Sequence, residues 1–560
     1  MPSTASSVTS QPGSHVSAPG AAETAESAEG AVSAGAAETA REAASPSSLV
    51  RDLNRLAPLG VAMLGFFVVA LDAQIVNVAL ANMGAALGGG LSGLQWVVTS
   101  YTLTFSSLLL FAGTLSDRIG ARRGYGLGMG IFVLASAVCG FAPTLPTLVA
   151  ARIAQGVGAA LITPTSLALI RVAYEDARER AKAVAYWALG GSVAAAAGPI
   201  LGGALTQLDW RIIFFINLPV GGLALALLAR VPDSSRRAKA FDPVDQVTAL
   251  AALVGFTYGV IEGGSRAYSD PDVIAAFVLA AVGAVGFVAS QARGRHPMVP
   301  LDMFRGRPVM ISLAAAFITM AGFYGVVFVQ SLYFQQFRGA SPLETGLLFL
   351  PMTALVAILN PTAAKVALRF GSRVPVIGGQ VLMVIGLLEL ALAPADLPLW
   401  AVAALMVPVG VGGSFTVPPL TSLLLDAVPA PRAGTASGVL NTARQVGGSM
   451  GVAATGAVIA HLSGAAGGFM DGLRVSLVAL AVLVVLTTVL SVLLPSGEDA
   501  ARRAPRSALG CAAERCCVAD SSPDSSPRPP RKPPARPEGP RRRQVPRAQT
   551  AHPRPAARAA

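Results

Sequence analysis

Residues 113–123 read GTLSDRIGARR, and this stretch joins two long apolar segments, 94–114 and 124–143. Each apolar segment has about the 20 residues that an α-helix needs to cross a hydrocarbon layer about 30 Å thick. The arginines between them are typical of a short loop at a membrane surface. The stretch therefore predicts two transmembrane helices joined by a basic loop, and the same pattern continues along the chain.

The composition of the whole chain agrees with that pattern. Of its 560 residues, 53% are hydrophobic and only 13% are charged, and the mean hydropathy is +0.60. A chain this apolar and this poor in charge is not that of a soluble protein. We therefore expect an all-α integral membrane protein whose solvent is the lipid bilayer.

The formal net charge of +12 raises the alternative of nucleic-acid binding, but most of the surplus lies after Pro495. Residues 496–560 are rich in Pro and Arg and cannot bury enough apolar surface to fold. We expect them to form a disordered cytoplasmic tail that contacts anionic lipid at most. Residues 1–55, rich in Ala, Ser, Gly and Glu, are expected to form a second disordered cytoplasmic tail. No nucleic-acid partner is expected.

Charged and Pro/Gly-rich joints divide the apolar sequence into fourteen predicted transmembrane helices. Lys and Arg gather in the loops that follow even-numbered helices, and such loops stay in the cytoplasm. Both termini of a multi-pass protein of the cell membrane are therefore expected to be cytoplasmic. The predicted spans are 58–80, 94–114, 124–143, 146–169, 184–206, 212–230, 244–262, 272–291, 309–333, 345–367, 373–394, 398–424, 435–461 and 473–494.

Two short motifs recur at nearly the same offset, about 251 to 254 residues. RIGAR at 118–122 returns as RFGSR at 369–373, and GVG at 156–158 returns at 410–412. Transporters are often built from duplicated bundles, so this repeat predicts that spans 1–6 correspond to spans 9–14. The predicted domains are a first six-helix bundle at 56–231, a two-helix insert at 232–308 and a second six-helix bundle at 309–495.

The GTLSDRIGARR stretch resembles the cytoplasmic loop signature of the major facilitator superfamily. The resemblance implies the major facilitator fold, two six-helix bundles with two inserted helices here, and a motif that gates the cytoplasmic side. In it glycine permits close helix contact and the arginines donate hydrogen bonds that latch the halves together. The alternative is a positive-inside anchor alone. The motif residues are Gly113, Asp117, Arg118, Gly120, Arg122 and Arg123.

Residues 71–80 read LDAQIVNVAL and resemble a signature of the fourteen-helix drug:proton antiporters of that superfamily, with Ala81 where Pro is usual. A carboxylate inside a membrane span is costly unless it is paired, hydrated or protonated, so Asp72 is a candidate for proton coupling. The alternative is a buried hydrogen bond that packs two helices.

Arg152 lies in a segment similar to the fourth-helix motif of the superfamily, whose arginine is associated with proton transfer. At about 1.5 Å per residue, Asp72 lies about 21 Å from the cytoplasmic start of its span and Arg152 about 9 Å from the periplasmic start of its own. In a core about 30 Å thick these depths nearly coincide. The pair would favour the ionised carboxylate, and withdrawal of Arg152 would favour its protonation. A static neutralising pair is the alternative.

A cluster of small residues in the fifth span resembles the antiporter-type motif of exporters, with Ala at one usual glycine. Missing side chains allow close packing and the proline bends the helix, whereas the alternative is generic small-residue packing. Export therefore rests on the combination of motifs. The motif residues are Gly198, Pro199, Gly202 and Gly203.

Further resemblance to the fourteen-helix subfamily lies at 209–221, where aromatic residues and Arg fit an interfacial belt, and at 441–448. Within that subfamily, the sequence most resembles the methylenomycin-resistance type of multidrug exporter. Arg444 lies near mid-membrane, where it can meet an anionic substrate group or a carboxylate. The predicted substrate cavity consists of Asn77, Trp96, Tyr101, Gln155, Asn441 and Arg444.

No Gly-Lys-Ser/Thr triplet occurs in the sequence, so ATP is not expected to drive transport. The four histidines do not cluster with Cys or carboxylates, so no metal, cofactor or catalytic set is expected. We predict a proton-coupled antiporter of small organic molecules such as antibiotics. The alternatives are a proton symporter for uptake of a metabolite and a non-transporting membrane sensor. The sequence indicates neither the substrate nor the oligomeric state, although two deep arginines favour neutral or anionic compounds.

Overall fold

The computed structural model describes residues 46–233, 243–294, 299–429, 432–463 and 468–494, with side chains from Leu56 onward. The predicted tails therefore lie outside the described residues, apart from 46–55. These ten positions belong to the first described helix, α2, which begins at Pro46. The first helix is thus longer at its start than the span predicted from hydropathy.

Helices are the only regular structure of the described residues, which contain no β-strand. In this part of the chain, thirteen helices are long and apolar enough to cross a membrane, and each overlaps one predicted span. The all-α membrane fold class is therefore confirmed. The helices are α2 (Pro46–Leu87), α3 (Gly90–Ile119), α4 (Ala121–Gly140), α5 (Leu145–Ala173), α6 (Ala177–Leu208), α9 (Pro243–Ser265), α10 (Pro271–Arg293), α11 (Arg307–Leu332) continued by the π-helical turn η2 (Tyr333–Phe337), α12 (Pro342–Phe370), α13 (Arg373–Leu392), α14 (Leu399–Leu405) continued by α15 (Val407–Asp426), α16 (Ala433–Ser463) and α17 (Gly468–Ser491).

The predicted span at 212–230 is a shorter apolar helix, Ile212–Leu228. It is interrupted into α7 (Ile212–Phe215) and α8 (Asn217–Leu228). Pro219 cannot donate a backbone hydrogen bond to the carbonyl of residue 215, so the first turn of α8 cannot continue α7 regularly. Pro408 has the same effect between α14 and α15.

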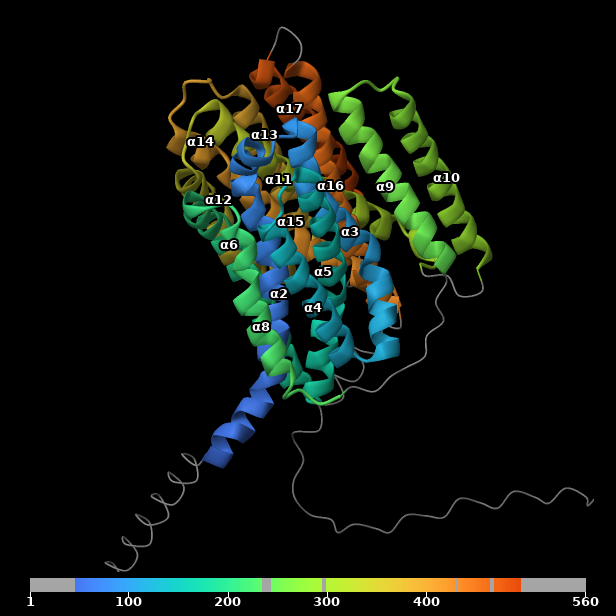
Figure 1. Cartoon of the computed structure of the whole chain (residues 1–560). Coiled ribbons are helices and arrows are strands. Elements are labelled where there is room, and N and C mark those ends of the chain that lie inside the picture. The colour runs from blue at the N-terminus through green and yellow to red at the C-terminus, as the bar shows by residue number, and fades with distance from the viewer. Residues whose placement is uncertain (1–45, 234–242, 295–298, 430–431, 464–467, 495–560) are drawn as a thin grey trace, which may run out of the picture. The chain divides into compact units, whose positions relative to one another are not determined.

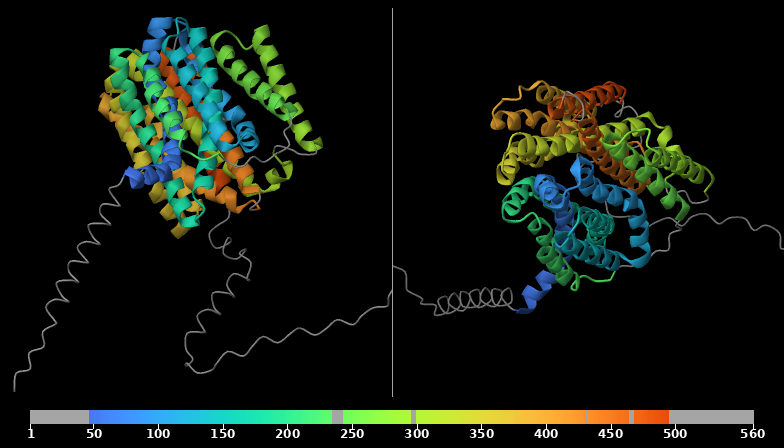
Figure 2. Two further views of the ribbon diagram at one scale, coloured as in Figure 1. Left: turned by 60° about the horizontal axis from the view of Figure 1, so that its bottom comes forward. Right: turned by 45° about the horizontal axis from the view of Figure 1, so that its top comes forward.

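The helices form two sets. In the N-terminal set, α2 to α8, the closest pairs are α2 with α6, α4 with α5, and α3 with α5; in the C-terminal set, α11 to α17, they are α11 with α16, and α13 with α15 and α17. The sets meet where α6 packs on α12 and α3 on α16, as the right-hand view of Figure 2 shows. Helices α9 and α10 pack on each other, and α9 contacts α3 and α16 (Figure 1). The domain boundaries at 231 and 308 stay predictions.

The two glycine motifs of the predicted repeat make the same contact. A Cβ added to Gly158 on α5 would lie 2.7 Å from the carbonyl oxygen of Gly128 on α4. One added to Gly412 on α15 would lie 2.5 Å from the carbonyl oxygen of Gly379 on α13. Only glycine lets two helix backbones approach this closely. Matching contacts of this kind are what a duplicated bundle would produce.

Large apolar side chains cover the outward faces of the helices. Leu134 on α4 and Val285 on α10 are both 70% exposed, and many Val, Leu and Ile side chains of α10 and α17 are exposed as well. In water such a surface would drive aggregation, whereas hydrocarbon chains solvate it without cost. The exposed surface therefore agrees with a protein that lies in a bilayer.

Candidate functional site

A carboxylate and a guanidinium meet inside the N-terminal set. The side chains of Asp72 on α2 and Arg152 on α5 are 0% and 1% exposed, and Arg152 Nη1 donates a hydrogen bond to Asp72 Oδ2. Either charge alone would be costly inside a bilayer, and each compensates the other. The structure thus brings together the two residues whose depths match in the sequence.

Arg152 is held by several elements at once. Its Nε donates to the carbonyl oxygen of Val97 on α3 at 3.0 Å, and its Nη1 also donates to Gln155 Oε1 at 2.9 Å. The guanidinium carbon lies 4.2 Å from the centroid of the Tyr101 ring, which is a cation–π contact. The Tyr101 hydroxyl donates to the carbonyl oxygen of Val69 on α2 at 3.1 Å. These contacts together fix the orientation of the guanidinium.

Asp72 also accepts hydrogen bonds from two amides. Its Oδ1 accepts from Gln155 Nε2 and from Asn217 Nδ2, both at 3.1 Å. The same two amides donate to Ser136 Oγ on α4, at 2.7 Å and 3.3 Å. Asp72, Arg152, Gln155, Asn217 and Ser136 form one buried polar network, which we call the Asp72 network. Four helices, α2, α4, α5 and α8, supply its members.

Sequence reasoning missed Asn217 and Ser136 as parts of this site. The resemblance at 209–221 was interpreted as an interfacial belt, and Ser136 is a single hydroxyl in an apolar span. A usable signal was the position of Asn217 two residues before Pro219, because a helix interruption inside a membrane protein commonly lines a buried polar site.

Two of the residues predicted for the substrate cavity lie outside the Asp72 network. Asn77 Nδ2 donates to the carbonyl of Ala73 in its own helix at 3.1 Å, and its Oδ1 has no hydrogen-bond partner among the described residues. Trp96 Nε1 donates to Glu262 Oε1 on α9 at 2.9 Å, and its ring centroid lies 5.9 Å from that of Tyr258. A buried indole N–H seeks an acceptor, so Trp96 faces α9 and not the Asp72 network.

The last two predicted cavity residues lie on α16, outside the Asp72 network. Arg444 Nη1 donates to Asn441 Oδ1 at 3.3 Å. Arg444 Nε is buried without a hydrogen-bond partner in the part of the chain that the structure describes. Tyr324 on α11 interacts electrostatically with both Arg444 and Tyr101.

The glycines of the loop motif play different parts. Gly120 separates α3 from α4 with φ of 91°, a left-handed backbone angle that glycine adopts without strain. Asp117 and Arg118 stand in the last turn of α3. A Cβ added to Gly113 would meet no atom within 4 Å, so the close helix contact expected of Gly113 is not formed in this conformation.

The last two arginines of the motif contact the end of the N-terminal set. Arg122 Nη2 donates to the carbonyl oxygen of Ala229 at 3.3 Å, and Arg123 Nη2 lies 3.8 Å from Asp233 Oδ2. Both partners follow α8, so these two contacts do not join the two sets of helices. A latch between the halves therefore stays a prediction.

The small residues of the fifth span pack α6 against α2. A Cβ added to Gly198 would lie 2.7 Å from Gln74 Cβ, and one added to Gly202 would lie 2.7 Å from the carbonyl oxygen of Ile75. Both contacts lie within one turn of Asp72 on α2. A larger side chain at either glycine would therefore displace the helix that carries the carboxylate.

The same motif also packs α6 against the C-terminal set. A Cβ added to Gly203 would lie 2.5 Å from the carbonyl oxygen of Pro342, at the start of α12. On α12, Gly346 packs against the carbonyl group of Pro199. The motif is thus part of the interface between the two sets.

We call the end of the helices at which α2, α4 and α6 terminate the distal end. Toward this end the two sets are joined by hydrogen bonds. Ser331 Oγ on α11 donates to the carbonyl oxygen of Asn77, and Gln335 Nε2 donates to that of Val78 at 2.9 Å. Gln95 Nε2 on α3 donates to a carbonyl oxygen of α16 at 2.7 Å. Toward the other end, α3 and α16 remain in contact through Leu110.

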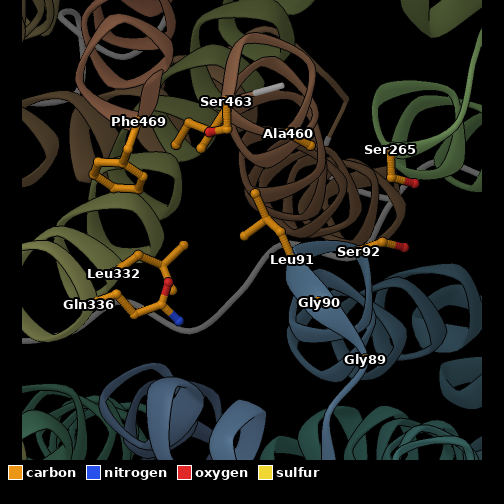
Figure 3. A pocket seen from close by; sticks show the side chains of 11 residues that line it. Gly89, Gly90, Leu91, Ser92, Ser265, Leu332, Gln336, Ala460, Ser463 and Phe469 are labelled. Carbon is orange, nitrogen blue, oxygen red and sulfur yellow. The ribbon is translucent and has the colours of Figure 1, made fainter. Parts of the chain in front are cut away.

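A pocket of about 440 Å³ lies at the distal end, beside the start of α3 (Figure 3). Its lining residues include Ser92 on α3, Ser265 at the end of α9, Gln336 on η2 and Phe469 on α17. None of the predicted substrate residues lines it. The described residues also contain no group of three or more His, Cys, Asp or Glu that could hold a metal ion.

The family follows from comparison of this helical bundle and its sequence with known proteins. Residues 62–452 match the family model described as Major Facilitator Superfamily. That family consists of membrane transporters. The chain belongs to the Major Facilitator Superfamily.

Its relatives within the family include resistance proteins. The chain is 38% identical over 403 residues to the multidrug resistance protein Stp of Mycobacterium tuberculosis, an alignment that covers 71% of this chain and 74% of that one. It is 37% identical over 439 residues to the methylenomycin A resistance protein of Bacillus subtilis, covering 76% and 93% of the two chains. The fold is similar to the inward open conformation of the xylose transporter XylE from E. coli, with a TM-score of 0.55, 16% sequence identity and coverage of 79% and 97%.

Proposed function

We propose that this protein exports small organic molecules, antibiotics among them, across the cell membrane in exchange for protons. The observation that carries the proposal is the Asp72–Arg152 pair, buried at 0% and 1% exposure within a transporter fold. An ionisable side chain inside a membrane bundle is a natural proton site when its partner can be withdrawn. The gradient of protons, and not ATP, supplies the energy.

The chemistry of the exchange follows from the contacts of the pair. A proton that binds Asp72 removes the negative charge that compensates Arg152, and the guanidinium must then find other partners. Gln155 and Asn217 offer side-chain oxygens near by, so the network has a second arrangement available. Return of Arg152 to Asp72 favours the ionised carboxylate and expels the proton. Protonation and helix position are thereby coupled in a two-state element.

Alternating access supplies the second half of the mechanism. With both termini in the cytoplasm, as the basic loops indicate, the distal end faces outward. The hydrogen bonds from Ser331 and Gln335 to α2 then close the outer side, which supports an inward-facing arrangement. Rocking of the N-terminal set against the C-terminal set would break these bonds and expose the Asp72 network to the outside.

Export in preference to uptake is supported by the relatives. The relatives are named as multidrug and methylenomycin A resistance proteins. The packing glycines of α6 contact both α2 and α12, so they lie at the interface that must separate in each cycle. We therefore propose that an outward substrate movement is paired with inward proton movement.

The test is transport by purified protein in liposomes with an imposed pH difference. The compounds are a panel of antibiotics that includes methylenomycin A, with wild type compared with Asp72→Asn. The matched control is Asp396→Asn, which makes the same change at an exposed carboxyl between α13 and α14. We expect wild type and the control to move substrate in the direction opposite to the proton flow. The gradient-driven rate of Asp72→Asn should be lower by at least about tenfold.

Two results would contradict the proposal. One is transport by wild type that is equal with and without the pH difference. The other is gradient-driven transport by Asp72→Asn at the wild-type rate. Concentration of a substrate on the side that gains protons would instead indicate a symporter.

A further inference from the structure

Arg444 is a second deep cation, and it lies far from either end of its helix. It follows the start of α16 by eleven residues, which is about 16 Å at about 1.5 Å per residue. That places the guanidinium near the middle of a hydrocarbon core about 30 Å thick. A cation at this depth is costly unless an anion or water compensates it.

The two deep arginines differ in how far they are satisfied. Arg152 has a carboxylate, an amide, a carbonyl and an aromatic ring as partners. Arg444 has one neutral acceptor, Asn441 Oδ1, at 3.3 Å, and its Nε has no partner within the described residues. A guanidinium presents five N–H donors, so most of the donor capacity of Arg444 is unused.

The acids on the helices around Arg444 do not pair with it. Helices α3, α17 and α9 also pack on α16, and they carry Asp117 in the last turn, Asp471 in the first turn, and Asp245 and Glu262, respectively. Neither α11 nor α16 contains Asp or Glu, and α15 has only its last residue, Asp426. On α9, which also packs on α16, Glu262 accepts hydrogen bonds from Ser92 and Trp96 and pairs with Arg266 at 3.3 Å. Within the described residues, Arg444 has no salt-bridge partner. Its counter-ion is therefore expected to come from outside the chain.

The surroundings of Arg444 are firmly built. Gly447 and Gly451, on the next turns of α16, pack directly on the backbone of α11. A Cβ added to Gly448 would lie 2.7 Å from Tyr324 Cδ2, so this glycine lets the tyrosine ring lie on α16 one turn from Arg444. Tyr324 is itself only half-buried, and its ring makes an edge contact with Phe323 at 5.5 Å. The site thus combines a deep guanidinium on a closely packed helix with an aromatic side chain that carries a hydroxyl.

We propose that Arg444, oriented by Asn441 and flanked by Tyr324, binds the carboxylate of transported substrates, so that the protein selects organic acids with an apolar or aromatic body. A guanidinium binds a carboxylate with two parallel hydrogen bonds, which provides both charge compensation and orientation. The Tyr324 hydroxyl can donate to the same group, and its ring covers the apolar body. This inference rests on the proposed function, because it names the substrate class of that transporter.

The Arg444 site also lies within electrostatic reach of the Asp72 network. Tyr324 interacts electrostatically with Tyr101, whose ring lies on the Arg152 guanidinium. A carboxylate that binds at Arg444 therefore brings a negative charge to the side of the Asp72 network.

The experiment compares acids with their own neutral esters. Probes are six small aromatic carboxylic acids, 2-naphthoic acid among them, and the six methyl esters, each measured in liposomes with an imposed pH difference after subtraction of leak into protein-free liposomes. Variants are Arg444→Gln, Arg444→Lys and the matched control Arg474→Gln, which alters an exposed arginine of α17. Thermal unfolding of each purified variant with acid or ester gives a binding readout that does not depend on transport.

The expected result concerns the ratio of acid to ester transport. Wild type and Arg474→Gln should favour the acids, Arg444→Gln should lower the ratio about tenfold or more, and Arg444→Lys should restore part of it because it keeps the charge but loses the bidentate fork. The acids, and not the esters, should raise the melting temperature of wild type.

Different outcomes separate this inference from the proposed function. If wild type moves esters or cationic drugs under the gradient but none of the acids, or if Arg444→Gln leaves the ratio unchanged, the carboxylate site is wrong while the exporter stands. If Arg444→Gln does not fold, failure of the acids to raise the wild-type melting temperature above that with the esters overturns the inference. If no compound at all moves under the gradient, the proposed function itself fails.

Discussion

Removal of one member of the Asp72–Arg152 pair is expected to destabilise the protein more than removal of both. In Asp72→Asn, Arg152 keeps its charge in a site that is 1% exposed and loses the carboxylate that compensates it. In Arg152→Gln, Asp72 is left as an uncompensated carboxylate at 0% exposure. The double variant Asp72→Asn/Arg152→Gln has no charge at this site.

The magnitudes follow from the contacts that remain. Breaking a buried ion pair by removing one partner costs about 3–5 kcal/mol. Arg152 retains hydrogen bonds to Gln155 at 2.9 Å and to Val97 at 3.0 Å and the contact with the Tyr101 ring, so Asp72→Asn is expected near the lower value. The double variant loses charge-assisted hydrogen bonds but leaves no unpaired charge, a loss of about 1–2 kcal/mol. It should therefore be more stable than Asp72→Asn by about 1–2 kcal/mol, and more stable than Arg152→Gln by a larger margin.

The assay is thermal unfolding of the three variants and wild type in one detergent, paired with transport in liposomes under a pH difference. We expect stability in the order wild type, double variant, Asp72→Asn and Arg152→Gln, and loss of gradient-driven transport in all three variants. If the two single effects simply add in the double variant, the residues do not act as a compensating pair. If the double variant still couples transport to protons, the pair is a static neutralising contact and the coupling group lies elsewhere.

The remaining predictions concern packing, surface charge and closure. Gly158→Ala places a Cβ 2.7 Å from a carbonyl oxygen of α4 and should lower the melting temperature, because such overpacking costs about 1–3 kcal/mol of stability. Gly113→Ala adds a Cβ that meets nothing within 4 Å and should leave the melting temperature unchanged. Equal effects of the two substitutions would contradict the packing argument. The hydrogen bond from Arg432 holds the pKa of Asp302 below its usual value, so the contribution of Asp302 to stability is present above about pH 4 and is lost as the pH falls through the lowered pKa. The melting temperature of wild type relative to Asp302→Asn, measured from pH 7 to pH 3, should show that difference shrink at the acid end and not before. Gln335→Ala removes a hydrogen bond of 2.9 Å to α2 at the distal end. Spin labels at the end of α6 and the start of α12, both at the distal end, should therefore report a larger population of long distances than in wild type.

Much of the fold was predictable because hydropathy and basic loops act on long segments. A helix of about 20 apolar residues is recognisable in sequence whatever it packs against. The interruption between α7 and α8 depends instead on one residue, Pro219, and hydropathy averages over it. The early start of α2 at Pro46 is likewise invisible to hydropathy, because residues 46–55 are not apolar.

The site was predictable only in part. The depth of a residue along its helix can be computed from sequence, whereas the neighbouring helix that its side chain faces cannot. Asp72 and Arg152 could be matched by depth alone. Trp96 was assigned to the substrate cavity from sequence, but its indole donates to Glu262 on α9, a contact set by the position of the inserted helix pair. Asn217 was overlooked because its segment fits an interfacial belt equally well.

The internal repeat preserves the scaffold while the two halves differ in chemistry. Gly158 and Gly412 make the same backbone contact in the two sets. At the same offset of about 251 to 254 residues, the position of Arg152 corresponds to Met406, which is fully buried. The C-terminal set therefore has no equivalent of the cation that holds Asp72.

The converse holds for the second cation. Arg444 on α16 corresponds by the same offset to a position between Gly190 and Val193 on α6, where no charged residue stands. A duplicated bundle needs identical packing in both halves in order to rock symmetrically, but it needs only one proton site and one substrate anchor. Placing the anionic site in one half and the cation that awaits an anion in the other makes each rocking step move the two sites relative to each other. The charge of the substrate at Arg444 and the charge of the proton at Asp72 then act on the same conformational equilibrium, one from each set of helices. Two ligands that act on one equilibrium are coupled.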